Sequence, residues 1–216
     1  MNLNDLYKKV SVIPIGDFPP SALSGLLHGY ISIYSIVRVN PWLEDVYGSQ
    51  WDIHERIREI AGELADLIQD PSIALEDRVG HIADLMETYL TYSDMDFLDI
   101  ALDAAYGIIS PEGSDEIVLP CRTPEMCRLL CSCYYFTGEE ECAKEIVKDK
   151  MNEYNSNQIL INIDNWNWFR AIEVYCSIVG DKINLFLKDN IENEEIGCLS
   201  DYFDQLAYKE LFLDNK

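Results

Sequence analysis

Hydrophobic residues recur at helical spacing along most of the chain. Ile53, Ile57, Ile60 and Leu64 follow one another at steps of three or four residues, which places them on one face of a helix. Capping residues, prolines and glycines divide this pattern into segments of helical length. The pattern predicts about nine helices, at roughly 20–38, 51–69, 73–92, 95–109, 124–137, 139–153, 164–179, 181–191 and 200–213.

The predicted helices fall into pairs. Tight turns between two helical runs recur at intervals of 42 to 46 residues, at Gly48-Ser49, Ser93-Asp94, Gly138 and Gly180. This interval is the length of a two-helix repeat of the HEAT or armadillo kind, in which hairpins stack to cover their apolar faces. We therefore expect an all-α fold over residues 1–216, built as a single domain of stacked helical hairpins. Either a HEAT/armadillo-like superhelix or an irregular bundle fits the pattern.

One segment, residues 110–123, interrupts the helical rhythm. It is longer than most connections between helices, and it is acidic at first and apolar afterwards. We expect Ile117, Val118 and Leu119 to cover the end of the core as an extended strap, in preference to a functional lid. A short strand, or a weak subdivision of the domain at this point, is the alternative.

The composition is that of a folded domain. Of the 216 residues, 48% are hydrophobic and 11% aromatic, more than a disordered acidic tail contains. The apolar stretch from Ala22 to Val37 is interrupted by His28 and is too short to span a bilayer, so we expect a core helix. The N-terminus has no apolar segment typical of a secretory signal, and the seven cysteines are an odd number. These features favour a cytoplasmic protein.

The net charge narrows the choice of partners. The chain has 39 acidic and 16 basic residues, which gives a formal net charge of −23. A body this acidic repels phosphate backbones and anionic lipid surfaces, and no basic cluster longer than Lys8-Lys9 opposes the repulsion. We therefore expect no direct binding to nucleic acid or membrane, and a basic protein as the partner.

The cysteines do not have the spacing of a metal site. Structural zinc sites use a close pair of thiolates separated by two residues, whereas five cysteines here are separated by five, three, one and eight residues. They are Cys121, Cys127, Cys131, Cys133 and Cys142. We expect them to serve as small apolar core residues, with no metal and no cofactor.

Cysteine catalysis is also disfavoured. A reactive cysteine needs a nearby histidine and a positive environment that stabilises the thiolate, and an anionic chain provides the opposite. The chain has three histidines, His28, His54 and His81. We expect them to be surface residues or helix residues with satisfied hydrogen bonds.

A carbohydrate-active enzyme is a further alternative. Glycosidases built on rings of helical hairpins use paired carboxylates, and Trp166, Trp168 and Phe169 would offer a surface for stacking a sugar. Aromatic residues at the start of an amphipathic helix also pack in cores, however. Six hairpins close such a ring and about four are predicted here, so we expect no enzymatic activity.

The distribution of acidic residues is more informative. Residues 51–110 contain 14 acids against 3 bases, and no lysine or arginine occurs from residue 79 to residue 121. Asp96, Asp99 and Asp103 line one stripe of the helix predicted over 95–109, where like charges cost stability and the helix dipole explains only the first turn. Such a cost indicates a cationic partner. The predicted partner-binding residues are Asp84, Glu87, Asp94, Asp96, Asp99, Asp103, Glu112, Asp115 and Glu116.

A compact, acidic, all-helical chain with this acid run from Asp84 to Glu116 resembles the immunity proteins of bacterial toxin systems, including those of contact-dependent growth inhibition. The resemblance implies a non-enzymatic protein that binds a cationic toxin, such as a nuclease. Its carboxylates would then occupy a site built for phosphates and occlude it. The alternative is a helical-repeat scaffold that binds a peptide or a partner helix in an apolar groove. Salt weakens the first kind of binding more than the second.

Overall fold

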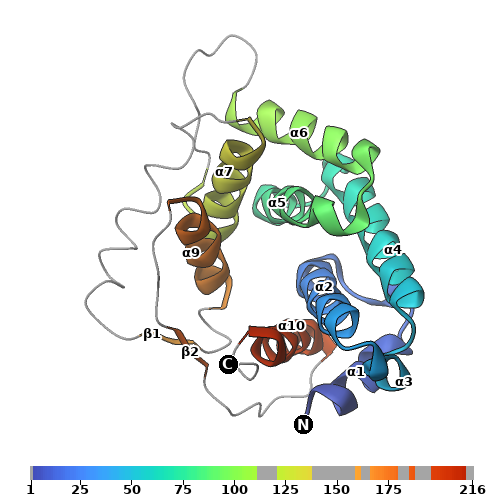
Figure 1. The fold of residues 1–216 in the computed structure, drawn as a ribbon. Helices are drawn as coiled ribbons and strands as arrows, with labels where there is room; N and C mark the ends of the chain where they lie inside the picture. The colour runs from blue at the N-terminus through green and yellow to red at the C-terminus, as the bar shows by residue number, and fades with distance from the viewer. Residues whose placement is uncertain are drawn as a thin grey trace.

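The computed structural model describes residues 2–110, 121–137, 159–161, 166–179, 185–187 and 196–212. The fold is all-α, as predicted, and Figure 1 shows its helices. They are α1 (Leu3–Ser11), α2 (Leu23–Val39), α3 (Glu44–Tyr47), α4 (Gln50–Gln69), α5 (Leu75–Tyr92), α6 (Met95–Ile109), α7 (Pro124–Thr137), α9 (Trp166–Val179) and α10 (Ile196–Phe212). Single 3-10 turns occupy Ile15–Asp17, Pro20–Ala22 and Pro41–Leu43.

Most of the predicted helices are confirmed. Those expected at 20–38, 51–69, 73–92, 95–109, 124–137, 164–179 and 200–213 are α2, α4, α5, α6, α7, α9 and α10. The helix predicted over 139–153 and the central part of the 110–123 segment lie outside the described residues. The helix predicted over 181–191 is wrong, because residues 185–187 form a strand.

Two three-residue strands accompany the helices. They are β1 (Ile159–Ile161) and β2 (Leu185–Leu187), and they pair in parallel with Ile159 opposite Leu185 and Ile161 opposite Leu187. Parallel neighbours require a crossover connection, and α9 lies between the two strands in the sequence. A three-residue pair adds too little structure to alter the all-α class.

Helix α1 was not predicted, although its local chemistry is clear. Asn2 caps it, because the Asn2 side-chain oxygen accepts a hydrogen bond of 2.9 Å from the backbone N–H of Asp5. Leu3, Leu6 and Val10 are buried on one face, and α1 packs against α3 and α10. The N-terminal helix therefore covers part of the core beside the C-terminal helix.

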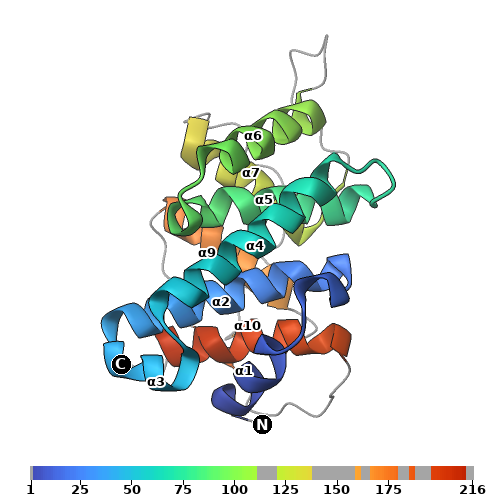
Figure 2. The ribbon, with the colours of Figure 1, turned by 90° about the vertical axis from the view of Figure 1, so that its right-hand side faces the viewer.

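The helices form a closed ring. Helices α2, α5, α7, α9 and α10 surround the centre of Figure 1, and α4 and α6 lie outside them. α10 packs on α2, α2 on α5, α5 on α7 and α7 on α9, and a hydrogen bond of 2.7 Å from Trp166 Nε1 to Asp204 links α9 to α10. Figure 2 shows these helices stacked, with α4 crossing them obliquely. The hairpins therefore do not extend into an open superhelix, because the C-terminal helix returns to α2.

Two glycines allow α10 to approach α2 closely. A Cβ atom at Gly29 would lie 2.3 Å from Cδ1 of Phe203, and one at Gly25 would lie 2.9 Å from the backbone carbonyl carbon of Ser200. Any other residue at Gly29 would therefore overlap the Phe203 ring. The closing contact of the ring depends on these four residues.

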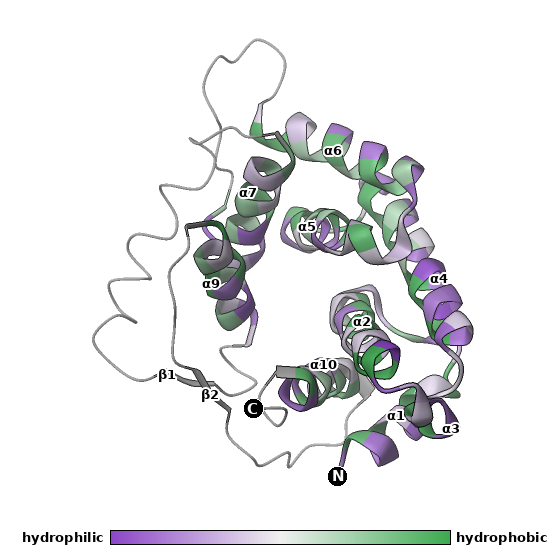
Figure 3. Cartoon of the chain, viewed as in Figure 1, coloured by the Kyte–Doolittle hydropathy of each residue, from purple (hydrophilic) through white to green (hydrophobic). Residues whose placement is uncertain are grey.

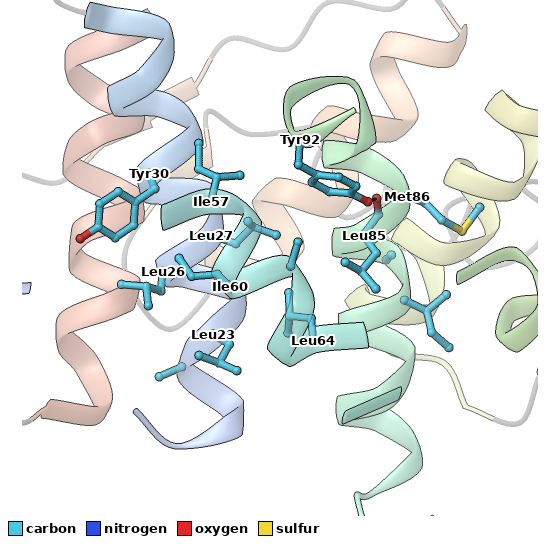
Figure 4. Packing of buried hydrophobic residues seen from close by; sticks show 14 of the residues in the cluster. Leu23, Leu26, Leu27, Tyr30, Ile57, Ile60, Leu64, Leu85, Met86 and Tyr92 are labelled. Carbon is cyan, nitrogen blue, oxygen red and sulfur yellow. Dashed lines mark hydrogen bonds between the residues drawn. The ribbon is translucent and has the colours of Figure 1, made fainter. Parts of the chain in front are cut away.

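The core lies between α2, α4 and α5, where Leu26, Ile57 and Met86 are fully buried (Figure 4). Hydrophilic residues occupy the outer turns of α4 and α6 (Figure 3). In the described chain one segment, Pro20–Val39, is long and apolar enough to cross a membrane, but 67% of its apolar window is buried. It packs against α4 and α10, so the predicted core helix is confirmed.

Candidate functional site

Three of the predicted partner-binding residues lie together on α6. Asp96, Asp99 and Asp103 are all exposed, and we call them the acidic face of α6. Within the described residues none of the three forms an ion pair. Asp94 differs, because one of its oxygens accepts a hydrogen bond from the backbone N–H of Asp96 and the other lies 2.9 Å from Arg58. The acidic face therefore consists of three aspartates whose charge is not offset by an ion pair in the described part of the chain.

Asp84 and Glu87 do not belong to this surface, contrary to the sequence prediction. Asp84 is 0% exposed and Glu87 is half-buried, and both face the guanidinium group of Arg128. The helical period explains the difference, since this part of α5 faces the interior of the ring. The three remaining predicted acids, Glu112, Asp115 and Glu116, lie outside the described residues.

A polar cavity of about 380 Å³ lies between the ring helices, among the N-terminal turns of α2, α5, α7 and α9 and beside α10; we call it the central cavity. Each surrounding helix contributes side chains to its lining: His28 from α2, His81 from α5, Arg128 from α7, Arg170 from α9 and Asp204 from α10. A cavity lined by several ionisable groups from different elements is the usual setting of a binding or catalytic site in proteins.

His28 lies at the centre of a buried network. Its Nε2 is 2.9 Å from Oδ1 of Asp84, and its Nδ1 contacts the guanidinium of Arg170. Because arginine only donates, Nδ1 accepts this hydrogen bond, and Nε2 lies between Asp84 and Nη2 of Arg128, 3.0 Å away. Both ring nitrogens of His28 are therefore engaged by the side chains that surround it.

Asp84 is stabilised as a carboxylate. Burial alone would raise its pKa, but the Arg128 guanidinium and the His28 imidazole beside it hold the pKa of Asp84 well below its usual range. Arg128 also lies 2.8 Å from Glu87. One guanidinium therefore bridges two carboxylates of α5 and fastens α7 to α5.

Arg170 is less tightly paired than Arg128. Its nearest carboxylate oxygens are 3.5 Å away on Glu173 and 3.9 Å away on Asp204. Those carboxylates have other partners, since Tyr208 donates a hydrogen bond of 2.6 Å to Glu173 and Trp166 donates to Asp204. Arg170 thus connects α9 to α10 beside the cavity through long contacts.

Several buried polar atoms at the cavity have no hydrogen-bond partner among the described residues. Both ring nitrogens of His81 are unpartnered, although His81 is only 3% exposed, and Oδ1 of Asp204 is unpartnered as well. Burial lowers the pKa of His81, so its imidazole is neutral at pH 7. Burial and the nearby Asp204 raise the pKa of Asp201 to about 6. These groups would gain hydrogen bonds from a polar occupant of the cavity.

One cluster has the spacing of a metal site. The ligand atoms of His28, Asp84 and Glu87 lie within 4.8 Å of one another. Nη2 of Arg128 contacts Asp84 and lies 3.0 Å from His28 Nε2 and 2.8 Å from Glu87. A metal ion would have to displace this guanidinium group. The cation that the cluster holds is therefore Arg128 itself.

The described cysteines are core residues. Cys127, Cys131, Cys133 and Cys176 are buried and Cys121 is half-buried, and all five are free thiols. A contact with Cys127, together with burial, raises the pKa of the Cys131 thiol, which keeps it protonated. The interpretation of these cysteines as small apolar side chains is confirmed for the described part of the chain.

The aromatic residues at the start of α9 pack inward. Trp166 and Phe169 are each 3% exposed, their ring centroids are 4.8 Å apart, and both contact Tyr208. Trp166 and Phe169 therefore pack against one another and against α10, Trp166 also borders the cavity, and Trp168 is half-buried. The three rings do not form one exposed stacking surface.

Of the residues that line the cavity, His28, His81 and Trp166 were named from the sequence, but they were not brought together, and the two arginines and the α10 carboxylates were not identified. His54 has the satisfied hydrogen bond that was expected, 2.9 Å from the carbonyl oxygen of Thr91, but His81 is neither exposed nor hydrogen-bonded. Arg128 lies between the core residues Cys127 and Leu129. A charged residue inside an apolar run was the available signal for this site.

Comparisons with known proteins found no match. No family model matches this chain, and neither the curated proteins nor the solved structures contain a significant relative. Function is therefore inferred from the residues described above.

Proposed function

We propose that this chain is a non-enzymatic binding protein that captures a cationic protein through the acidic face of α6. The partner that fits best is a toxin with a phosphate-binding cleft, such as a nuclease. The observation that carries the proposal is the exposure of Asp96, Asp99 and Asp103 without an ion-pair partner in the described chain.

The physical argument concerns the cost of this arrangement. Residues three and four positions apart on a helix are neighbours, and like charges there are destabilising. The dipole of α6 compensates only Asp96, which lies in the first turn. Asp99 and Asp103 have no such compensation. Charged residues retained at a cost to stability are typical of binding surfaces, where they accelerate encounter with a partner of opposite charge.

The test is a triple variant, Asp96→Asn, Asp99→Asn and Asp103→Asn. A matched control removes three exposed acidic charges from other elements, with Asp17→Asn, Asp45→Asn and Asp66→Asn. The probe is the toxin domain encoded beside the gene of this chain, and affinity is measured at two salt concentrations.

The two variants have the same net charge but should behave differently. We expect the α6 variant to lose at least tenfold in affinity at low salt and the control less than threefold. Equal losses of affinity in the two variants would show that net charge alone determines binding. The absence of a neighbouring toxin gene would remove the proposed partner. Either result contradicts the proposal.

A second candidate function, a scaffold for a peptide or helix, is favoured by one observation. An apolar groove of about 230 Å³ lies between α5, α7 and α9, lined by residues that include Leu90 and Tyr135. These two side chains are 69% and 67% exposed. Binding in this groove would change little with salt, whereas binding on the acidic face weakens with salt.

A further inference from the structure

The lining of the central cavity carries more negative than positive charge. Its carboxylates are those of Glu76, Asp77, Glu125, Asp201 and Asp204. Its guanidinium groups are those of Arg128, which pairs with Asp84 and Glu87, and Arg170, which lies 3.5 Å from Glu173 and 3.9 Å from Asp204. Even with Arg170 set against Asp204, carboxylates outnumber guanidinium groups around the cavity.

Two of the lining residues also need hydrogen-bond donors. Asp204 is 2% exposed, and its Oδ1 has no partner among the described residues. His81 is neutral and buried, so one of its unpartnered nitrogens is an acceptor. Both residues line the same cavity. A ligand that presents N–H groups would satisfy these acceptors.

We propose that the central cavity binds an organic cation, an alkylammonium or guanidinium group held by Asp201 and Asp204 with His81 as a further acceptor. The chemistry is the same for a free amine and for a lysine or arginine side chain of a protein. The proposal does not rest on the acidic face of α6, which lies on a different helix.

An organic cation fits better than a metal ion for two reasons. The only described cluster with metal-like spacing is filled by a guanidinium nitrogen, that of Arg128, so it has no room for a metal ion. The cavity volume of about 380 Å³ also corresponds to roughly a dozen water molecules at ~30 Å³ each. That space suits a ligand with several carbon atoms.

Asp201 lies where the ring closes. Its Oδ1 would be 3.0 Å from a Cβ atom at Gly25, so the carboxylate sits in the close crossing of α2 and α10. Asp204 lies three residues later on α10, on the same side of that helix. These two carboxylates, on one side of α10 and at the edge of the cavity, form the cation-binding element of the proposed site.

The experiment is isothermal titration of the full chain with agmatine, which carries both cationic groups. Capped Gly-Arg-Gly and Gly-Lys-Gly peptides represent protein side chains. Glutarate and 1,5-pentanediol are the anionic and neutral probes of similar length. We expect saturable binding of at least one cationic probe and no binding of the last two.

The test variant is Asp201→Asn, and Asp204→Asn is the second. The matched control is Asp66→Asn, an exposed residue of α4 that belongs to neither proposed site, which makes the same charge change away from the cavity. We expect at least a tenfold loss of affinity for Asp201→Asn and less than a twofold loss for Asp66→Asn. Circular dichroism and thermal melting identify any variant that fails to fold, and the other cavity variant then provides the measurement.

Each outcome supports or overturns the proposal. Agmatine binding that is lost in Asp201→Asn indicates a free amine, and peptide binding lost in the same variant indicates a protein side chain. No binding of any cationic probe at 10 mM overturns the proposal, as does an equal loss in Asp66→Asn. The triple α6 variant should still bind the cation, which separates this site from the proposed function.

Discussion

Arg128 on α7 and Asp84 on α5 form an ion pair inside the ring, where Arg128 is 4% and Asp84 0% exposed. Removal of one member would leave the other as an uncompensated charge in the interior. The pair therefore couples α5 and α7, which are separated in the sequence by the whole of α6.

The first prediction follows from this pair. Arg128→Met should lower the free energy of unfolding by about 3–5 kcal/mol, because Asp84 and Glu87 lose the group that offsets their charge. The matched control, Arg58→Met, breaks the exposed pair with Asp94 and should cost less than about 1 kcal/mol. Urea denaturation measures both values. Similar losses in the two variants would show that the buried network contributes no more than a surface pair.

The second prediction concerns the closing contact between α2 and α10. Gly29→Ala should destabilise the protein by about 1–3 kcal/mol, because its Cβ would overlap the Phe203 ring at 2.3 Å. Gly107→Ala is the control, since nothing lies within 4 Å of a Cβ there. It should stabilise α6 by about 0.5–1 kcal/mol through helix propensity. Thermal melting should thus move in opposite directions, and a shift in the same direction would contradict the observed crossing.

The helices were predictable because long amphipathic periods specify them locally. α1 was overlooked even though Asn2 is a capping residue and Leu3, Leu6 and Val10 have helical spacing. The error over 181–191 has a physical cause: Leu185, Phe186 and Leu187 form a short continuous apolar run, which fits a buried strand as well as a helix. A pattern this short does not decide between strand and helix without its partner strand.

The candidate sites were predictable to a different degree. The acidic face of α6 follows from the helical spacing of Asp96, Asp99 and Asp103, and the structure exposes all three. The cavity does not follow, because it unites five helices that meet only when α10 returns to α2. Asp84 was assigned to the surface because a count of acids along the sequence does not reveal that Arg128 pairs with it in the interior.

The third prediction is a pH dependence at Asp201. Its pKa is raised from 3.8 to about 6 by burial and by Asp204. Between pH 4 and pH 6 the folded state therefore keeps a proton that the unfolded state has already released. Stability is therefore lost as pH rises from 4 to 6. Asp201→Asn removes this penalty and should stabilise the protein at pH 7.5 by up to about 3 kcal/mol.

The gain should shrink at pH 4.5, where Asp201 of the folded wild type is protonated. Thermal melting at the two pH values measures it, with Asp99→Asn as the exposed control. An Asp201→Asn variant with the same gain at both pH values would show that Asp201 does not cause the effect.

The last prediction concerns His81, whose two ring nitrogens are buried without partners. His81→Leu should raise the free energy of unfolding by about 1 kcal/mol at pH 7, because an unsatisfied polar group leaves the interior. The gain should increase on acidification. Burial lowers the pKa of His81 below its usual 6.5. As the pH drops below 6.5, the unfolded wild type therefore takes up a proton that the folded protein does not, and the stability of the wild type decreases.

The same variant should bind agmatine more weakly than the wild type, since the cavity loses an acceptor. A stability gain combined with an affinity loss is the pattern of a residue retained for binding at a cost to the fold. Denaturation at pH 7 and pH 5.5, with titration of agmatine on the same preparation, measures both quantities. If His81→Leu instead lost stability at both pH values, the imidazole would be part of the structural core, and the cavity would depend on Asp201 and Asp204 alone.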